Sequence, residues 1–319
     1  MRAVRYHEYG EADVLRVEEI ERPSPKSDEV LAEIRAASVN PVDVMFRTGQ
    51  YGEIPLPSIP GGDGAGVVTS VGRDVKSFAE GDRVIISGMD RAEGGTFAEY
   101  AAVPSKKLAR LPEHVSFTEG GAIGNVGATA WTALTELATI DPGDRVLIHG
   151  GSGGVGHAAV QIAASAGAEV LATAGSADAR TRIEQLGAAE TFDYESDSLA
   201  DDIFAATDGE GVETIVDHRL EEYLALDLQV VSSGGQIIST MGHIPETVGV
   251  PFYNKEVTLQ ALKMDNRPVR TPILQRVIRL VEDGVLAAEV ADSYEFDDVE
   301  QAHQDVIAGG YVGKLVVTP

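Results

Sequence analysis

The residues best suited to chemistry lie in a glycine-rich stretch near the middle of the chain. Arg145–His149 is a strand candidate with an apolar centre, and Gly151, Gly153 and Gly156 then satisfy the spacing G-x-G-x-x-G. Glycines at these positions permit a tight turn, let the backbone approach a pyrophosphate and let a helix pack closely against the strand. The helix expected over Val155–Ala166 offers free N–H groups and a partial positive charge to the phosphates. Because a strand precedes the loop and a helix follows it, the stretch predicts a dinucleotide-binding loop rather than a plain glycine-rich turn.

The predicted contacts of this loop with the dinucleotide come from its first glycine and from the residues that lead into the helix. They are Gly150, Gly153, Gly154, Val155 and Gly156.

Residues after the next predicted strand bear on the choice between NADPH and NADH. Folds specific for NAD end this strand with an acid that bonds the ribose hydroxyls, whereas the strand here ends without one. Ser176, Arg180 and Tyr194 provide a hydroxyl, a guanidinium and a phenol, which suit a 2′-phosphate. The alternative is that Arg180 and Arg182 only occupy a solvated helix face, and Asp178 lies close to both. We predict NADPH, with NADH as the less favoured cofactor.

Composition excludes several other chemistries. The 319 residues include no cysteine, which rules out disulfides, thiolate zinc sites and a cysteine nucleophile. The seven histidines show no metal-ligand spacing, so no metal site is predicted. A net charge of −26 disfavours nucleic acids and anionic membranes as partners, because both require basic patches. No apolar run approaches the ~18 residues of a membrane span.

The distribution of charge indicates a cellular setting. Acidic residues are spread along the whole chain, most basic residues are arginines, and the N-terminus has no apolar signal region, so we expect a cytoplasmic protein. An evenly acidic, lysine-poor surface is typical of salt-loaded cytoplasms, where strong screening relieves the mutual repulsion. The alternative is an ordinary acidic bacterial enzyme.

The pattern of predicted strands and helices that position these residues changes along the chain. Residues 1–118 alternate short strands with clusters of Pro, Gly and Asp, which predicts a β-rich module. Residues 119–255 begin with an alanine-rich helix and then alternate strands with helices, which predicts a doubly wound parallel sheet. Residues 256–319 contain a strand candidate at Glu256–Leu262, two helices and a final strand. The sequence therefore predicts an α/β protein whose dinucleotide domain is inserted between a β module and a segment that returns to it.

Short motifs follow one another in a fixed order over nearly the whole chain. They are Ser38–Asp43, Arg47–Tyr51, Pro60–Gly66, Gly81–Val84, Gly95–Tyr100, Ala128–Trp131, the glycine loop and Gly313–Leu315. Their order and spacing resemble the quinone oxidoreductase and zeta-crystallin branch of the medium-chain dehydrogenase/reductase superfamily. The resemblance implies a GroES-like catalytic domain, a Rossmann domain and a cleft between them. It also implies a homodimer formed through the edge of the Rossmann sheet, near Glu256–Leu262.

The resemblance also bears on zinc. Zinc enzymes of this superfamily have a cysteine near position 40 and a His-Glu pair before Gly64, whereas this chain has Asn40 and then Gly62-Asp63. A structural zinc lobe built from cysteines cannot exist here. Because the ligand count fails, we expect no zinc, and hydride transfer from a nicotinamide to an electron-poor acceptor.

By resemblance, residues from separate motifs surround the nicotinamide. Asn40 and Asp43 are expected near its reacting end, Thr129 beside the ring or its ribose, and Lys314 on the phosphate side. Tyr51 occupies the position where related enoyl reductases have a proton-donating tyrosine. Two interpretations of Tyr51 stay open, a proton donor and an aromatic wall for a flat quinone. Asn40 likewise has the alternative of only capping a turn.

One segment departs from the family pattern. After the strand that ends in Val216-Asp217, relatives have small residues and glycines, but this chain has His218 and Arg219. His218 is expected near the nicotinamide ribose, where it could bond a hydroxyl; the alternative is an exposed histidine without a role. Met241, after the next strand, is also assigned to the cofactor.

Three functions follow from these residues. The first is an enzyme that reduces quinones with NADPH, using Asn40 and Tyr51 in its catalytic pocket. The close rival is reduction of an activated alkene, a 2-alkenal or an enoyl-CoA, with Tyr51 as proton donor and Arg47 and Arg91 as candidates to meet an acyl-CoA. The rival from another class is a non-catalytic protein that only binds the dinucleotide. In each case the expected partner is a small molecule or a second copy of the chain.

Overall fold

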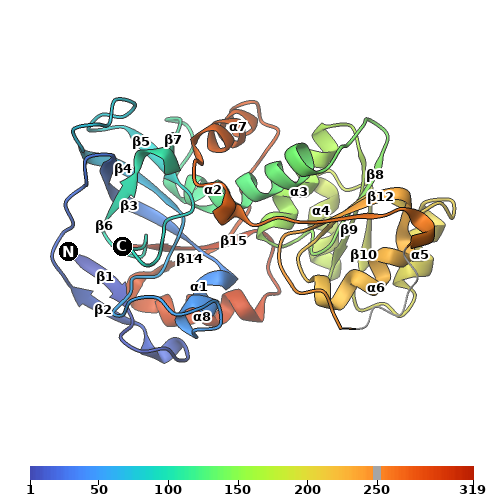
Figure 1. The fold of residues 1–319 in the computed structure, drawn as a ribbon, viewed down its shortest axis with the longest axis horizontal. Helices are drawn as coiled ribbons and strands as arrows, with labels where there is room; N and C mark the ends of the chain where they lie inside the picture. Colours follow the sequence, from blue (N-terminus) through green and yellow to red (C-terminus); the bar gives the residue numbers. More distant parts are fainter. Residues whose placement is uncertain (247–252) are drawn as a thin grey trace.

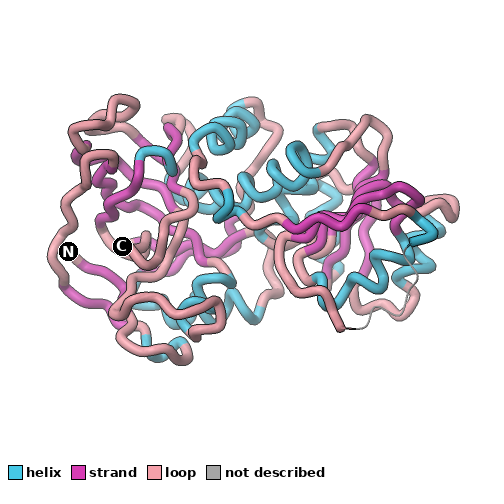
Figure 2. The backbone as a smooth tube through the Cα atoms, in the orientation of Figure 1, coloured by secondary structure: helices cyan, strands magenta, loops and turns pink. Residues whose placement is uncertain are grey.

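In the computed structural model, which describes residues 1–246 and 253–319, strands dominate one end and a helix-covered sheet forms the other (Figures 1 and 2). Both chain termini lie in the strand-rich end, so the C-terminal segment returns to the domain where the chain began (Figure 1). The α/β class and the two architectures predicted from the sequence are confirmed.

The strand-rich domain is built around β3 (Glu29–Val39), the longest strand. Its seven-stranded sheet has the order β14-β15-β3-β4-β5-β7, and β6 also pairs with β3. The other strands are β4 (Gly64–Val71), β5 (Arg83–Ile86), β6 (Tyr100–Pro104), β7 (Leu108–Arg110), β14 (Val290–Glu295) and β15 (Lys314–Thr318). A separate pair is formed by β1 (Arg2–Arg5) and β2 (Arg16–Glu19).

The pairing of β15 with β3 positions the end of the chain. The two strands run antiparallel, and Leu315 lies opposite Val39. Because Lys314 begins β15 and Asn40 follows β3, these two residues must lie close together at one edge of the sheet.

The second domain contains a six-stranded sheet in which every pairing is parallel. Its order is β10-β9-β8-β11-β12-β13, the doubly wound arrangement whose order reverses between β8 and β11. The strands are β8 (Arg145–Ile148), β9 (Glu169–Ala174), β10 (Glu190–Asp193), β11 (Val212–Asp217), β12 (Val231–Ser239) and β13 (Thr258–Ala261). The connecting helices are α3 (Gly154–Ser165), α4 (Ala177–Gln185), α5 (Leu199–Ala206) and α6 (Leu220–Val230). The strand expected at Glu256–Leu262 is thus β13, the edge of this sheet.

Helix α2 (Phe117–Thr132) lies at the junction of the two domains (Figure 1). Ser116 caps its first turn by accepting the N–H of Glu119, whose carboxylate bonds back to Ser116. Its many alanines and glycines allow close approach to β3, β4 and α3. One apolar core therefore runs from Ile85 through Ile123 to Ile148, so α2 links the two domains through continuous packing.

The remaining helices cover the strand-rich domain and the junction. They are α1 (Pro41–Arg47), α7 (Thr271–Glu282) and α8 (Val299–Ala308), with short 3-10 turns at Ala12–Val14, Ser105–Lys107, Tyr253–Lys255, Met264–Asn266 and Phe296–Asp298. A π-helical turn at Ala133–Leu137 extends α2. Within the two described segments, no helix is long and apolar enough to cross a membrane.

Candidate functional site

The site begins where β3 gives way to α1. Pro41 occupies the first turn of α1, where its missing N–H costs nothing. The Asp43 carboxylate turns back and accepts the backbone N–H of Asn40 at 2.9 Å through Oδ2. This local bond fixes both side chains next to the inner end of β3.

Arg91 provides the counter-charge for Asp43. Its Nε and one terminal nitrogen donate to Asp43 Oδ1 at 2.9 and 2.6 Å, and its guanidinium lies 4.9 Å from the centre of the Phe46 ring. Burial alone would lower the pKa of Arg91, but the carboxylates of Asp43 and Asp63 outweigh it and raise that pKa. Arg91 therefore stays charged in a buried setting.

Asp63 lies on the other side of Asn40. Its Oδ2 accepts from Asn40 Nδ2 at 2.9 Å, and its Oδ1 accepts the N–H of Gly88 at 3.0 Å. Burial raises the pKa of Asp63, and the positive charge of Arg91 opposes that rise. Asn40 and Asp63, which occupy two of the positions where zinc enzymes of the superfamily have the cysteine and the His-Glu pair, are thus hydrogen-bonded to each other.

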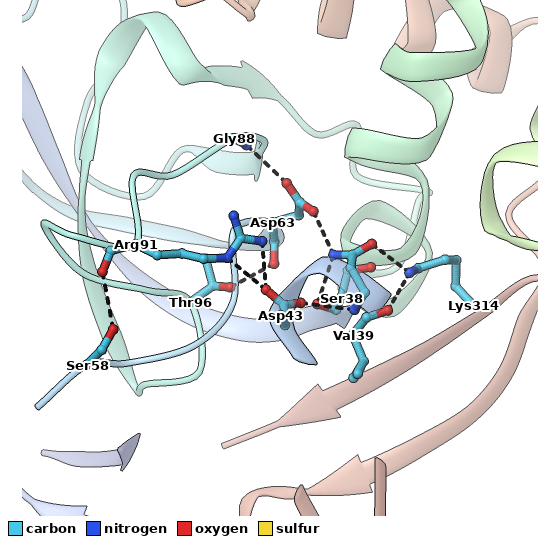
Figure 3. Close-up of polar contacts among 10 residues, drawn as sticks. Ser38, Val39, Asp43, Ser58, Asp63, Gly88, Arg91, Thr96 and Lys314 are labelled. Atoms are coloured by element: carbon cyan, nitrogen blue, oxygen red, sulfur yellow. Dashed lines mark hydrogen bonds and ion pairs between the residues drawn. The ribbon is translucent and has the colours of Figure 1, made fainter. Parts of the chain in front are cut away.

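Lys314 completes the group from the far end of the chain. Its Nζ donates to Asn40 Oδ1 at 2.9 Å and also to the carbonyl of Val39 (Figure 3). Burial lowers the pKa of Lys314 to about 8, although Asp63 and Asp43 oppose the change. We call Asn40, Asp43, Asp63, Arg91 and Lys314 the Arg91 network.

The Arg91 network does not fit a catalytic zinc. Asn40 already uses its amide on Asp63 and Lys314, so one carboxylate is left among the positions that would ligate the metal. Two cations stand beside that carboxylate. Over residues 1–246 and 253–319, no cluster of three histidine, cysteine, aspartate or glutamate side chains could hold a metal ion.

The glycine loop lies across the junction from the Arg91 network. The Gly313 N–H donates to Ser152 O at 2.8 Å, and a Cβ at Gly154 would come within 2.6 Å of Lys314 Cδ. Lys314 thus runs directly over the start of α3. A side chain at Gly156 would overlap the Gly150 carbonyl, so the loop requires glycine where the motif predicts it. The loop and the first-turn N–H groups of α3 fit a pyrophosphate.

The predicted 2′-phosphate residues converge beyond β9. Ser176 caps α4 by accepting the N–H of Ala179 at 3.2 Å, and Arg180 donates to Ala174 O at 3.2 Å and to Asp193 Oδ2 at 2.9 Å. Tyr194 is half-exposed, and its hydroxyl lies against Gly175.

Arg182 points elsewhere. It forms an ion pair with Glu289 at 2.6 Å, so of the two arginines only Arg180 stays beside Ser176 and Tyr194.

The remaining predicted residues, Thr129, Met241, His218 and Tyr51, lie in different parts of the structure. Thr129 lies within α2 and donates its hydroxyl to Asn125 O at 2.9 Å. Met241 is exposed after β12, and His218 lies beside the glycine loop. Tyr51 is 37% exposed, with its ring 4.7 Å from Phe46 and its hydroxyl 3.4 Å from Asp265 Oδ2. Phe46, whose ring also lies under the Arg91 guanidinium, thus stands between Tyr51 and the Arg91 network.

Arg47 and Arg91 do not meet solvent as an acyl-CoA would require. Arg47 is 2% exposed, and the Arg91 guanidinium is committed to Asp43. The interpretation that Arg47 and Arg91 meet an acyl-CoA at the cleft mouth is therefore wrong.

Sequence reasoning missed a buried polar cluster beneath the glycine loop. His149 Nε2 lies 2.9 Å from Asp227 Oδ1, and the Tyr223 ring stacks on His149 at 4.5 Å. Thr173 connects the cluster to the loop, since its Oγ1 accepts the Gly150 N–H at 3.0 Å and lies 3.4 Å from His149 Nδ1. The signal in the sequence was Asp227, a single acid between leucines in the second half of an apolar helix.

The carboxyls of this cluster are electrostatically unbalanced. Burial and the neighbouring Asp227 raise the pKa of Asp217 to about 7. Burial would lower the pKa of His149, but Asp227 more than offsets this and the pKa rises. We call His149, Asp217, Tyr223 and Asp227 the His149 cluster.

Comparison with known proteins places this geometry in a family. Residues 26–113 match the alcohol dehydrogenase GroES-like domain, and residues 186–317 match the zinc-binding dehydrogenase family. The chain is 35% identical to a quinone oxidoreductase of Homo sapiens, over 99% of this chain and 97% of the relative.

Solved structures agree over the whole chain. An NAD-dependent alcohol dehydrogenase superimposes with a TM-score of 0.92 at 30% identity, covering 100% of both chains. The quinone oxidoreductase of Escherichia coli, solved with NADPH, superimposes with a TM-score of 0.91 at 25% identity and the same coverage.

Proposed function

Since the chain belongs to the quinone oxidoreductase family of medium-chain dehydrogenase/reductases and is an NAD(P)H-dependent oxidoreductase, we propose that it reduces quinones with NADPH and without zinc. In the overall reaction a quinone accepts the hydride and one proton and becomes the hydroquinone, while NADPH becomes NADP⁺. The Arg91 network is the observation that supports this proposal. It ties the zinc-ligand positions to each other, so the acceptor must be electron-poor without help from a metal.

The chain's own residues bind and orient the reactants. The glycine loop from Gly150 to Gly156 binds the pyrophosphate, and Ser176, Arg180 and Tyr194 bind the 2′-phosphate. Asn40, Asp43 and Thr129 surround the nicotinamide end, Lys314 lies on the phosphate side, and Met241 also contacts the cofactor. When bound, NADPH supplies the hydride.

The protein holds these groups in fixed positions. Asn40 cannot rotate freely, because Asp63 and Lys314 bond opposite ends of its amide. Such a fixed polar wall orients an acceptor before reaction, which lowers the barrier more than a mobile wall would.

Tyr51 supports a second candidate, the reduction of an activated alkene. Among the described residues its hydroxyl has one hydrogen-bond partner, Asp265 at the long distance of 3.4 Å, so it can bond a carbonyl or donate a proton. A quinone needs no proton on carbon, whereas an alkene does.

The substrate test is NADPH oxidation in concentrated KCl with a naphthoquinone, a 2-alkenal and an enoyl-CoA compared side by side. We expect rapid turnover with the quinone alone, and little effect of Tyr51→Phe on it. Rapid alkene turnover that falls tenfold or more in Tyr51→Phe would replace quinone reduction by alkene reduction. A lack of turnover with all three acceptors, despite NADPH binding, would contradict both substrates.

Arg180 tests the cofactor. We expect Arg180→Ala to weaken NADPH binding about tenfold and to leave NADH binding nearly unchanged, because only NADPH has the 2′-phosphate that a guanidinium bonds. Fluorescence titration of both cofactors measures this, with Arg182→Ala as the matched control because Arg182 pairs with Glu289. Equal losses for NADPH and NADH would remove Arg180 from the 2′-phosphate site.

The edge strand β13 supports a homodimer. All four of its residues, Thr258–Ala261, are exposed, and Leu259 presents an apolar side chain on a strand that, among the described residues, pairs only with β12. Pairing of two such edges would bury both. Light scattering after size exclusion tests this proposal, with Leu259→Lys expected to shift the mass toward the monomer.

A further inference from the structure

His218 lies where the order of the six-stranded sheet reverses. It directly follows β11, the strand beside β8, and its Cδ2 is 3.9 Å from the position that a Cβ would take at Gly150. The crevice at such a reversal is where doubly wound sheets hold their ligands. The imidazole therefore stands next to the first residue of the glycine loop.

One nitrogen of the ring is anchored and the other is free. His218 Nδ1 lies 2.6 Å from Thr240 Oγ1, and the Thr240 N–H donates to Asp217 O at 2.9 Å. His218 Nε2 is buried and has no partner among the described residues. A buried polar atom without a partner is costly, so its presence beside a ligand loop points to a group that arrives with the ligand.

The chemistry of the ring selects the kind of group. Burial, together with a smaller effect of the nearby His149, lowers the pKa of His218 to about 4, so the ring is neutral near pH 7. A neutral imidazole whose Nδ1 contacts a hydroxyl can donate or accept at Nε2, and a hydroxyl suits either case. An anionic phosphate suits it less well, because a neutral ring brings no positive charge.

The direction of the dinucleotide identifies the hydroxyl. The pyrophosphate belongs at the start of α3, and the 2′-phosphate end lies beyond β9 with Arg180 and Tyr194. The other half of the molecule must then continue across β8 toward β11, where His218 stands.

We propose that His218 Nε2 hydrogen-bonds a hydroxyl of the nicotinamide-side ribose, with Thr240 holding the ring in place. This inference rests on the proposed NADPH dependence. It makes His218 a positioning residue for the nicotinamide, at a segment where the sequence departs from its family.

The test compares three ligands that share the adenosine end. NADPH and 2′-phospho-ADP-ribose both contain the second ribose, whereas 2′,5′-ADP lacks it. We expect His218→Leu to weaken the first two roughly tenfold and to leave 2′,5′-ADP unchanged, which is the loss expected for one buried hydrogen bond. His218→Gln places an amide near the position of Nε2 and should recover most of the affinity. Arg219→Ala, an exposed neighbour whose side chain pairs with Glu222, should change none of the three.

The outcomes separate this inference from the proposed function. An equal loss for all three ligands in both His218 variants would mean that His218 only supports the loop, and unchanged affinity for all three would remove it from the site; either result overturns the inference. Failure of the wild-type protein to bind NADPH would overturn the proposed function together with the inference. Normal NADPH oxidation by the wild type, with unchanged NADPH affinity in His218→Leu, would overturn the inference alone.

Discussion

The Arg91 network and the His149 cluster are both buried and charged, but they differ in charge balance and in how completely their polar atoms are hydrogen-bonded. In the Arg91 network two carboxylates face two cations, and over the described chain none of its five side chains leaves a buried polar atom without a partner. In the His149 cluster two carboxyls share one histidine, and Oδ2 of both Asp217 and Asp227 has no partner in the same residues.

The difference indicates different roles. A balanced, fully bonded network keeps one geometry, because any change would leave a charge buried alone. A cluster with more acid than base gains or loses protons near neutral pH. The first region therefore holds its side chains in fixed positions, whereas the second, which lies beneath the glycine loop, changes protonation near neutral pH.

The largest expected effect on stability comes from a substitution that breaks the Arg91 network. Arg91→Met removes the counter-charge of Asp43 and leaves Asp43 and Asp63 buried together. We expect the free energy of unfolding to fall by about 3–5 kcal/mol, the usual cost of removing one partner of a buried ion pair. Urea denaturation at pH 7 measures it.

A double-mutant cycle controls this prediction. Asp43→Asn with Arg91→Met should cost clearly less than the two single changes added together, because the pair then disappears as a unit. Additive losses, or a loss under about 1 kcal/mol for Arg91→Met, would show that the network is not balanced in the way described.

A smaller effect on stability is expected from removing the charge of Asp217 from the His149 cluster. The pKa of Asp217 is raised from 3.8 to about 7, so between these values the folded protein binds more protons than the unfolded chain. The contribution of Asp217 to the free energy of unfolding therefore falls as pH rises from about 4 to about 7. Asp217→Asn keeps an oxygen for the Arg219 N–H and removes the charge, so we expect stabilisation of about 1–2 kcal/mol at pH 8 and little change near pH 5.

Unfolding curves measured at several pH values test the predicted stabilisation by Asp217→Asn. His149 adds a separate slope at higher pH, because its raised pKa makes its contribution complete below about 6.5 and lost as pH rises through the folded value. That slope should remain largely in Asp217→Asn. A variant that is less stable than the wild type at pH 8 would contradict the account of Asp217.

The sequence predicted the glycine loop, the Arg91 network and the His149 cluster to different extents. The glycine loop is a local pattern, so Gly151, Gly153 and Gly156 predicted its position between β8 and α3. Lys314 and Asn40 lie 274 residues apart, and their contact depends on the pairing of β15 with β3, so the resemblance could place both residues near the cofactor but not their bond.

The His149 cluster had no local pattern that could predict it. His149 directly follows β8, Asp217 ends β11, and Asp227 lies on α6, a helix that was not predicted from the sequence. Only the parallel pairing of β8 with β11 brings them together. A polar residue in an apolar element was the available signal, and it could not name its partners.

The smallest expected effect is that of salt, and it tests whether burial or the surface dominates the charges. Molar KCl should raise the melting temperature of the wild type by a few degrees, because screening relieves repulsion among the surplus acids of a chain with net charge −26. The stability difference between wild type and Arg91→Met should stay constant over the same range, since Asp43 is fully buried and salt does not reach the pair. A melting temperature that stays flat or falls in KCl would contradict the prediction of a salt-loaded cytoplasm. A difference that shrinks with KCl would instead show that solvent reaches the Arg91 network, and the contrast between the two regions would then be one of degree.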